Sequence, residues 1–252
     1  MRGVLDAHGA EWVAGPTTLN ISANEVHVWK VDLFQRAVPD VNGVLSSDER
    51  ERASRFHFER DRQRFMIAHS SLRIILGRCL NLPPSNLVFA QTQYGKPFLT
   101  NLEAAGLLFN MSHSADVAVI AVAREREVGI DVEFKRADFA TSEVAEHFFS
   151  VAEIYTLSGL DPHERSGAFF NCWTRKEAYV KARGEGLSMP LDQFDVSLAP
   201  GVSAAMLNNR LDESEKSRWM FHDLRVASGY AAALVIEALQ SRPHLSFFSL
   251  TS

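Results

Sequence analysis

The chain has 252 residues, of which 46% are hydrophobic, and its formal net charge at pH 7 is −5. This length and apolar share predict one large or two small globular domains with well-filled cores. The negative charge argues against nucleic acid as a partner, because a phosphate backbone binds basic surfaces. With only two cysteines, neither a disulfide framework nor a thiolate metal site is predicted.

The sequence contains no signal for membrane attachment. Residues 1–6 lack the apolar core of a signal peptide, and the longest uninterrupted apolar run, Val117 to Ala123, is too short to cross a bilayer. The nine histidines show no HExxH spacing, which disfavours a zinc enzyme. A protein of the reducing cytoplasm, without a membrane or nucleic-acid partner, is therefore expected.

The first part of the chain predicts a mixture of strands and helices. Residues 1–24 carry no clear pattern and are interpreted as an N-terminal extension. The motif Ser46-Ser47-Asp48-Glu49 is a capping-box start for a short charged helix, and an apolar stripe predicts a longer helix from about Asp61 to Leu80. Strands or turns are further expected at Glu25–Leu33, Leu87–Ala90, Tyr94–Phe98, Leu107–Ser114 and Val117–Ala123.

Arginines are concentrated in one segment of this first part. Between Arg50 and Arg78 there are eight arginines and three acidic residues. Each arginine taken singly has a simple interpretation as part of a solvated helix face. Their clustering favours a surface that binds phosphates or an acidic protein.

The polar run Arg124–Glu127 is interpreted as the boundary between an N-terminal half, residues 25–124, and a C-terminal half, residues 125–252. The second half is expected to contain helices at Ser142–Phe149 and Ser150–Leu160, a helix from Phe169, and strands near Val128–Glu133, Phe194–Leu198, Trp219–Leu224 and Tyr230–Ile236. The pattern of the last segment also allows a helix. Both halves follow the order helix, glycine turn, proline, strand, which suggests two similar α+β units with a site in the cleft between them.

The run Val128–Glu133 alternates apolar and acidic residues with a period of two. In a strand, this pattern places Asp131 and Glu133 on one face, about 6.5–7 Å apart, and Ile130 and Val132 on the other. Two neighbouring carboxylates repel each other. A cation is therefore expected beside them.

The segment Phe169 to Leu187 predicts a helix that is closed by a glycine turn. At helical spacing Trp173, Glu177 and Lys181 lie in one column, in which Trp173 is interpreted as a packing residue. One interpretation of the Glu177–Lys181 pair is a solvated salt bridge worth a few tenths of a kcal/mol. The other joins Glu177 to the two strand carboxylates in an oxygen-ligand site suited to Mg²⁺.

Four motifs, in this order, resemble the 4′-phosphopantetheinyl transferase family. They are Tyr94-Gly95-Lys96-Pro97, Phe109-Asn110-Met111-Ser112-His113-Ser114, Gly129-Ile130-Asp131-Val132-Glu133 and Trp173-Thr174-Arg175-Lys176-Glu177-Ala178-Tyr179-Val180-Lys181. The chain is similar to the monomeric, broad-specificity members that serve surfactin-like synthetases, rather than to the short trimeric holo-acyl-carrier-protein synthases. The resemblance implies an α+β pseudo-dimer of two similar halves, each a small, mostly antiparallel sheet packed on a long helix.

The same resemblance implies an activity. The phosphopantetheine arm of coenzyme A, the co-substrate, would pass to a serine hydroxyl of an apo acyl or peptidyl carrier protein, and adenosine 3′,5′-bisphosphate would be released. Asp131, Glu133 and Glu177 would bind the Mg²⁺ cofactor. Glu177 would act as the general base, preferably through a metal-bound water, because a carboxylate that shares a cation is a poor base.

The resemblance also assigns the remaining site residues. The residues expected to contact coenzyme A are Arg64, Lys96, Pro97, Ser112, His113, Lys176 and Lys181. The residues expected to be catalytic are Glu177, Lys181 and Asp131. Among the contacts, Ser112 and His113 would donate to a phosphate and Lys96 would hold the nucleotide. Lys176 points elsewhere on its helix and is expected to activate or orient groups near the cleft.

Two other functions stay open on the sequence alone. An Asp-x-Glu pair with a distant Glu-x₃-Lys also suits a Mg²⁺-dependent nuclease, although the acidic net charge and the lack of a basic groove with interleaved aromatic residues count against it. A non-catalytic module that binds coenzyme A or a carrier domain is the third candidate.

Overall fold

The structure is a computed structural model that describes residues 11–34, 41–239 and 241–250. The described helices are α1 (Val41–Val44), α2 (Ser47–Ser54), α3 (Glu59–Leu80), α4 (Ser142–Phe148), α5 (Val151–Gly159), α6 (Pro162–Arg183) and α7 (Glu215–Arg218). The described strands are β1 (Val13–Ala14), β2 (Glu25–Asp32), β3 (Phe89–Gln91), β4 (Pro97–Leu99), β5 (Leu107–Ser114), β6 (Val117–Arg124), β7 (Val128–Phe134), β8 (Phe194–Val196), β9 (Met206–Asn209), β10 (Trp219–Asp223), β11 (Tyr230–Glu237) and β12 (His244–Ser249).

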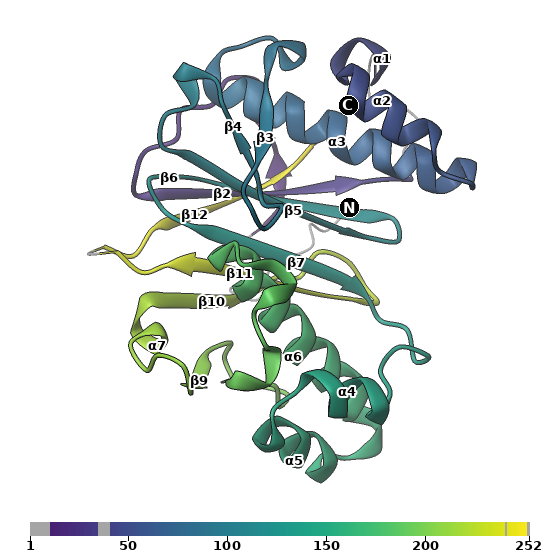
Figure 1. Ribbon diagram of the computed structural model, residues 1–252, viewed down its shortest axis with the longest axis vertical. Helices are drawn as coiled ribbons and strands as arrows, with labels where there is room; N and C mark the ends of the chain where they lie inside the picture. Colours follow the sequence, from purple (N-terminus) through teal and green to yellow (C-terminus); the bar gives the residue numbers. More distant parts are fainter. Residues whose placement is uncertain (1–10, 35–40, 240, 251–252) are drawn as a thin grey trace.

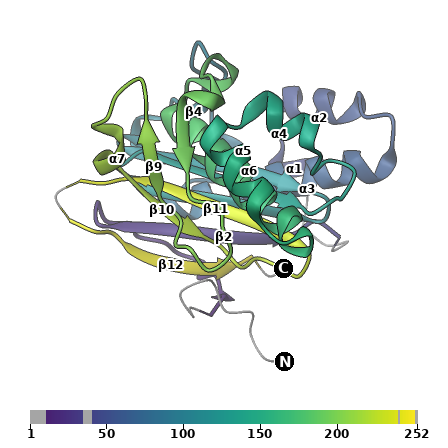
Figure 2. The ribbon, with the colours of Figure 1, turned by 90° about the horizontal axis from the view of Figure 1, so that it is seen from below.

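Two sheets form the middle of the molecule, and one long helix covers each outer face (Figure 1). The larger sheet has the strand order β1-β12-β2-β6-β5 and carries α3, whereas the smaller has the order β10-β11-β7 and carries α6. Figure 2, seen from the side of α6, shows this helix lying across the smaller sheet. The α+β architecture of two halves, each a sheet on a long helix, is therefore confirmed.

Three apolar cores fill the spaces between these four layers. One lies between α3 and the larger sheet, one between the two sheets, and one between α6 and the smaller sheet. Strand β2 contributes to two of them, because Val26 and Val28 face the other sheet while Trp29 and Val31 face α3. Its alternation therefore marks two buried faces, one for each set of residues.

Most of the predicted elements are present. The capping box at Ser46 is formed, with Glu49 as its partner, and α3 matches the long predicted helix. The helix expected from Phe169 begins earlier, at Pro162, whose ring suits a first helical turn. The segment from Tyr230 is strand β11, so the helix that its pattern also allowed is wrong. None of the described helices has the length and hydropathy that crossing a bilayer requires.

The two ends of the chain depart from the predicted division into halves. Strand β12 pairs in parallel with β2, so the last strand of the C-terminal half completes the sheet of the N-terminal half. Strand β1 pairs with β12 in turn, and Trp12, Leu19 and Ile21 are buried. The described part of the N-terminal extension is thus integral to the larger sheet, because its apolar side chains have a core to enter.

Candidate active site

The site forms where α6 lies directly on the backbone of β7. A Cβ atom at Gly129 would be 2.0 Å from the carbonyl oxygen of Ala178 and 2.3 Å from the amide nitrogen of Ala182. Only glycine permits so close an approach of strand and helix. The contact places Glu177 and Lys181, the neighbours of the two alanines, beside the acidic face of the strand.

Asp131 is at the centre of this arrangement and is only 2% exposed. Its Oδ1 atom accepts hydrogen bonds from Ser112 Oγ at 2.8 Å and from Lys181 Nζ at 2.5 Å. Lys181 Nζ also donates to Ser112 Oγ at 3.0 Å. The Oδ2 atom of Asp131 is buried and has no hydrogen-bond partner among the described residues. Strand β5, strand β7 and helix α6 therefore meet at one carboxylate whose second oxygen is buried without a described partner.

Glu133 and Glu177 surround this carboxylate. Glu133 accepts a hydrogen bond from Ser114 Oγ at 2.8 Å. Burial raises the pKa of Glu133, and the negative charge of Asp131 raises it further. Burial also raises the pKa of Glu177, followed by the charge of Asp131, while Lys181 opposes the shift. Both shifts show that an additional negative charge is unfavourable here, a condition that a bound divalent cation relieves.

The donor set fits Mg²⁺, which takes carboxylate oxygens as ligands. The buried Oδ2 atom of Asp131 and the two neighbouring carboxylates with raised pKa values are the observations that support this fit. The ligand atoms of these three described residues do not all lie within 4.8 Å of one another, so a shared cation would require their side chains to move.

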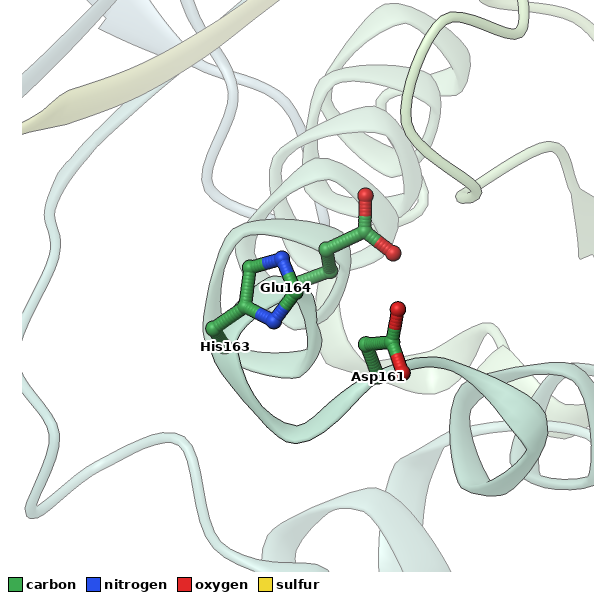
Figure 3. A group of neighbouring side chains, drawn as sticks. All are labelled: Asp161, His163 and Glu164. Atoms are coloured by element: carbon green, nitrogen blue, oxygen red, sulfur yellow. The ribbon is translucent and has the colours of Figure 1, made fainter.

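Within the described ranges, one group of acidic and histidine side chains has its ligand atoms all within 4.8 Å of one another: Asp161, His163 and Glu164 (Figure 3). These side chains lie at the first turn of α6 and are largely exposed. Glu164 precedes Glu177 by 13 residues, or about 20 Å along the helix axis. This group is therefore separate from the carboxylates on β7.

A recess opens beside Glu177 and Lys181. It has a volume of about 280 Å³, and its walls are the tip of the β3–β4 hairpin, β5 and the end of α6. A larger recess of about 560 Å³ lies between α3 and the hairpin, with Phe65, His69 and Arg73 in its lining. Both share the lining segments Pro97 and Asn110–Met111, so they adjoin along β5. Together they offer the size and mixed lining of a nucleotide site.

Lys96 and Pro97, which were expected to contact coenzyme A, line the smaller recess, but the ammonium group of Lys96 is engaged elsewhere. Its Nζ atom donates to Glu127 Oε2 at 2.6 Å and to the carbonyl oxygen of Ala182 at 2.9 Å. Ala182 lies in the last turn of α6, where carbonyl groups lack helical partners and a positive charge is favourable. Lys96 thus clamps the hairpin of the first half to the end of the helix of the second.

His113 and Arg64 lie on the other side of β5 from the carboxylates. Adjacent residues on a strand face opposite ways, so Ser112 points to β7 while His113 faces the α3 side. Desolvation lowers the pKa of His113, and the positive charges of His69, Lys181 and Arg64 add to this effect. Arg64 itself pairs with Asp116 at 2.5 Å.

The structure contradicts the prediction that Lys176 contacts coenzyme A. Its side chain is fully buried, and Nζ donates to the carbonyl oxygens of Leu191 at 2.7 Å and Phe194 at 2.6 Å. Glu153 Oε2 lies 2.8 Å away and balances the charge. Lys176 therefore ties α6 to α5 and to the segment before β8, on the side of the helix away from the recess.

The arginine-rich segment is also less available than its sequence suggests. Arg55, Arg60 and Arg62 each form a salt bridge with an acidic residue of their own helix, and Arg73 is buried against Glu49. Pairing within a helix accounts for much of this positive charge. These four residues therefore do not form a surface of unpaired positive charges.

Two residues that the sequence analysis did not assign hold the strands of the site together. Ser114 bridges Glu133 and the amide nitrogen of Phe134, and Asn110 Oδ1 accepts from the amide nitrogen of Ile130 at 2.9 Å. With Ser112 they form a series of polar side chains at every second position of β5. Polar residues at every second position of β5 lie opposite acidic residues at every second position of β7, and this alternation is the sequence signal that could have identified them.

Comparisons with known proteins agree with this geometry. The family model of the 4'-phosphopantetheinyl transferase superfamily matches residues 127–235, and that of the 4'-phosphopantetheinyl transferase N-terminal region matches residues 35–125. The 4'-phosphopantetheinyl transferase HetI of Nostoc sp. is 38% identical over 198 residues, which cover 77% of this chain and 83% of HetI. The 4'-phosphopantetheinyl transferase Sfp of Bacillus subtilis is 34% identical over 154 residues, which cover 61% and 66% of the two chains.

Among solved structures, the holo-[acyl-carrier-protein] synthase of Thermotoga maritima matches 44% of this chain and 62% of its own, with a TM-score of 0.32 and 20% identity. This likeness is too weak to add to the assignment.

Fold and site together define an α+β enzyme with a carboxylate cluster beside a nucleotide-sized recess. The chain belongs to the 4′-phosphopantetheinyl transferase superfamily, in which it is of the type represented by Sfp.

Proposed function

We propose that this enzyme transfers the 4′-phosphopantetheine arm of coenzyme A to a serine hydroxyl of an apo acyl or peptidyl carrier protein and releases adenosine 3′,5′-bisphosphate. The observation that carries the proposal is the buried Oδ2 atom of Asp131, which lacks a described hydrogen-bond partner beside a recess of nucleotide size. The names of the relatives support the same transfer. We further propose that the enzyme acts as a monomer in the cytoplasm.

The carboxylates would hold Mg²⁺, with Asp131 contributing Oδ2 and with Glu133 and Glu177 rotating toward it. When bound, Mg²⁺ supplies charge stabilisation for the pyrophosphate and the departing nucleotide. Lys181 would remain on the other oxygen of Asp131, and because its side chain also lines the recess, it could meet a phosphate there. Ser112 lies within hydrogen-bond distance of this ammonium group and orients it.

Two further roles are proposed, one for Glu177 at the smaller recess and one for His113, which lines neither recess but lies on the α3 side of β5. Glu177 lines it and has a raised pKa, which suits a base that takes the serine proton directly or through a water molecule. His113 has a lowered pKa and is therefore neutral at pH 7, so it offers a neutral N–H group to a phosphate on the α3 side of β5. Pro97 and the hairpin tip form the wall against which the nucleotide would lie.

The test is incubation of the enzyme with an apo carrier domain, coenzyme A and Mg²⁺, followed by intact-protein mass spectrometry of the carrier. We expect a mass gain of one phosphopantetheine group, which disappears in EDTA and in Asp131→Ala. The matched control is Asp161→Ala, which removes an exposed aspartate from the far end of α6 and should retain full activity. An unmodified carrier with the unaltered enzyme would refute the proposal, and cleavage of added nucleic acid would identify a nuclease instead.

A further inference from the structure

A buried carboxylate binds the C-terminal end of α6 on the face opposite Glu177 and Lys181. Glu215, on α7, is 2% exposed. Its Oε2 atom accepts hydrogen bonds from Tyr179 Oη at 2.5 Å, Arg183 Nη1 at 2.6 Å and Trp219 Nε1 at 2.7 Å. Its Oε1 atom accepts from Arg218 Nη1 at 3.3 Å. These donors satisfy the buried charge, and charge-assisted bonds of this kind are about twice as strong as neutral ones.

Two of these donors belong to successive turns of α6. Tyr179 and Arg183 are four residues apart, and each follows a site residue, Glu177 or Lys181, by two positions. Two positions correspond to about 200° around an α-helix, so the donors lie on the face opposite the site residues. A single oxygen atom of Glu215 therefore fixes the rotation of α6 about its axis over the two turns that carry Glu177 and Lys181.

Other contacts also restrain α6. At the preceding turn Arg175 pairs with Asp223 and Lys176 with Glu153. Against β7 the helix presents backbone atoms of Ala178 and Ala182 to Gly129. Lys96 holds the carbonyl oxygen of Ala182, which lies close to the helix axis and gives little leverage over rotation. The long side chains of Tyr179 and Arg183 reach outward to Glu215 and restrain rotation at the two turns that carry Glu177 and Lys181.

We propose that Glu215 is a positioning residue for the transferase reaction: it sets the rotation of α6 and thereby the approach of Glu177 and Lys181 to Asp131. The inference rests on the proposed function, because that function assigns the three carboxylates to one divalent cation. A rotation of α6 by 10° would move side-chain atoms about 6 Å from the axis by about 1 Å, which exceeds the roughly 0.5 Å within which a binding site must be held. The recess on the α3 side contains no atom of α6 and would be unchanged.

The experiment compares Glu215→Gln with the unaltered enzyme and with a control. Glutamine keeps the shape and one acceptor oxygen but loses the charge that attracts Arg183. The control is Asp195→Asn, which neutralises another paired carboxylate in the same half, whose salt bridge runs to Arg210, 2.8 Å away, and not to α6. Mn²⁺ binding to the protein alone is measured by electron paramagnetic resonance, and kcat and the KM for coenzyme A are measured with an apo carrier domain.

For Glu215→Gln we expect a Kd for Mn²⁺ raised at least fivefold and a kcat lowered at least tenfold, with the KM for coenzyme A within threefold of its original value. Asp195→Asn should change none of these by more than twofold. Tyr179→Phe, which removes one donor and retains the ring in the core, should shift the Mn²⁺ affinity in the same direction by a smaller factor. This second variant keeps the inference testable if Glu215→Gln folds poorly.

The outcomes separate the inference from the proposed function. If the unaltered enzyme binds no Mn²⁺ and modifies no carrier, the proposed function fails. If the unaltered enzyme does both, and both Glu215→Gln and Tyr179→Phe match it in Mn²⁺ affinity and kcat, Glu215 serves only the stability of the fold and the inference is overturned.

Discussion

The replacement Gly129→Ala tests how the site is assembled. The backbone of Gly129 has no positive φ angle, so alanine is allowed there and only the added methyl group matters. That group would lie 2.0 Å from the carbonyl oxygen of Ala178, whereas ordinary contact begins at about 3.4 Å. The neighbours are backbone atoms of a helix, which cannot move aside like the end of a side chain. Helix α6 would have to withdraw from β7 by about 1.4 Å.

The effects of this withdrawal on the unfolding free energy and on kcat/KM can both be estimated. Overpacking of a core typically costs 1–3 kcal/mol of unfolding free energy, and a rigid neighbour places this case at about 3 kcal/mol. A displacement of about 1 Å in a catalytic group can cost about 100-fold in rate, so kcat/KM should fall about 100-fold or more. The loss of activity should therefore exceed what the loss of folded protein explains.

Urea unfolding followed by fluorescence, together with carrier modification followed by mass spectrometry, measures both quantities. The matched control is Gly167→Ala on α6, where an added methyl group meets nothing within 4 Å and should stabilise the helix by about 1 kcal/mol or less. If Gly129→Ala unfolds at the original urea midpoint and retains kcat/KM within threefold, the close contact of helix and strand does not position the site.

Three further substitutions have effects on stability or on KM whose direction follows from the structure. Lys96→Met removes the bond to Glu127 and should lower the unfolding free energy by about 1–3 kcal/mol. It should also raise the KM for coenzyme A. Equal KM values for the variant and the unaltered enzyme would show that the β3–β4 hairpin keeps its position without Lys96. The donors His69, Ser46 and Arg73 outweigh burial and lower the pKa of Glu49 to about 2, so its stabilisation is complete above pH 4.5 and fades as the pH falls toward 2. Glu49→Gln should therefore cost about 2–3 kcal/mol at pH 7 and nearly the same at pH 5, but clearly less at pH 3, and a cost independent of pH would contradict the assignment. The pKa of Glu133 is raised, so its charge lowers the unfolding free energy of the metal-free protein above its folded pKa and not below pH 4.5. At pH 7.5 in EDTA, Glu133→Gln should therefore unfold at a higher urea concentration than the unaltered protein. This difference should disappear by pH 4.5.

The acidic strand and its geometry were predictable from the sequence because they depend on local periodicity. Alternation over six residues fixes which side chains share a face, and the structure places Ile130 and Val132 in the core between the sheets and Asp131 on the side of α6. The capping boxes at Ser46 and Ser150 are local signals of the same kind, and both are present.

What the sequence could not supply is the identity of partners distant along the chain. Helical spacing shows that Lys176 faces away from Glu177, but only the fold reveals that Glu153 and two carbonyl groups cover that face. The same limit applies to β12, whose six residues carry no mark of the strand that they join. Parallel pairing of β12 with β2 depends on the three-dimensional course of the residues between them.

The two oxygens of Asp131 differ in a way that would allow a lysine and the proposed cation to share one carboxylate. Oδ1 already accepts from Lys181 and Ser112, so half of the group is neutralised before any ligand enters. Oδ2 is buried and no described donor reaches it, and the negative charge of Asp131 raises the pKa values of Glu133 and Glu177. Under the proposed function, a cation held at Oδ2 would leave Lys181 on Oδ1. The lysine could then meet a phosphate bound to that cation, because a single strand residue would hold both.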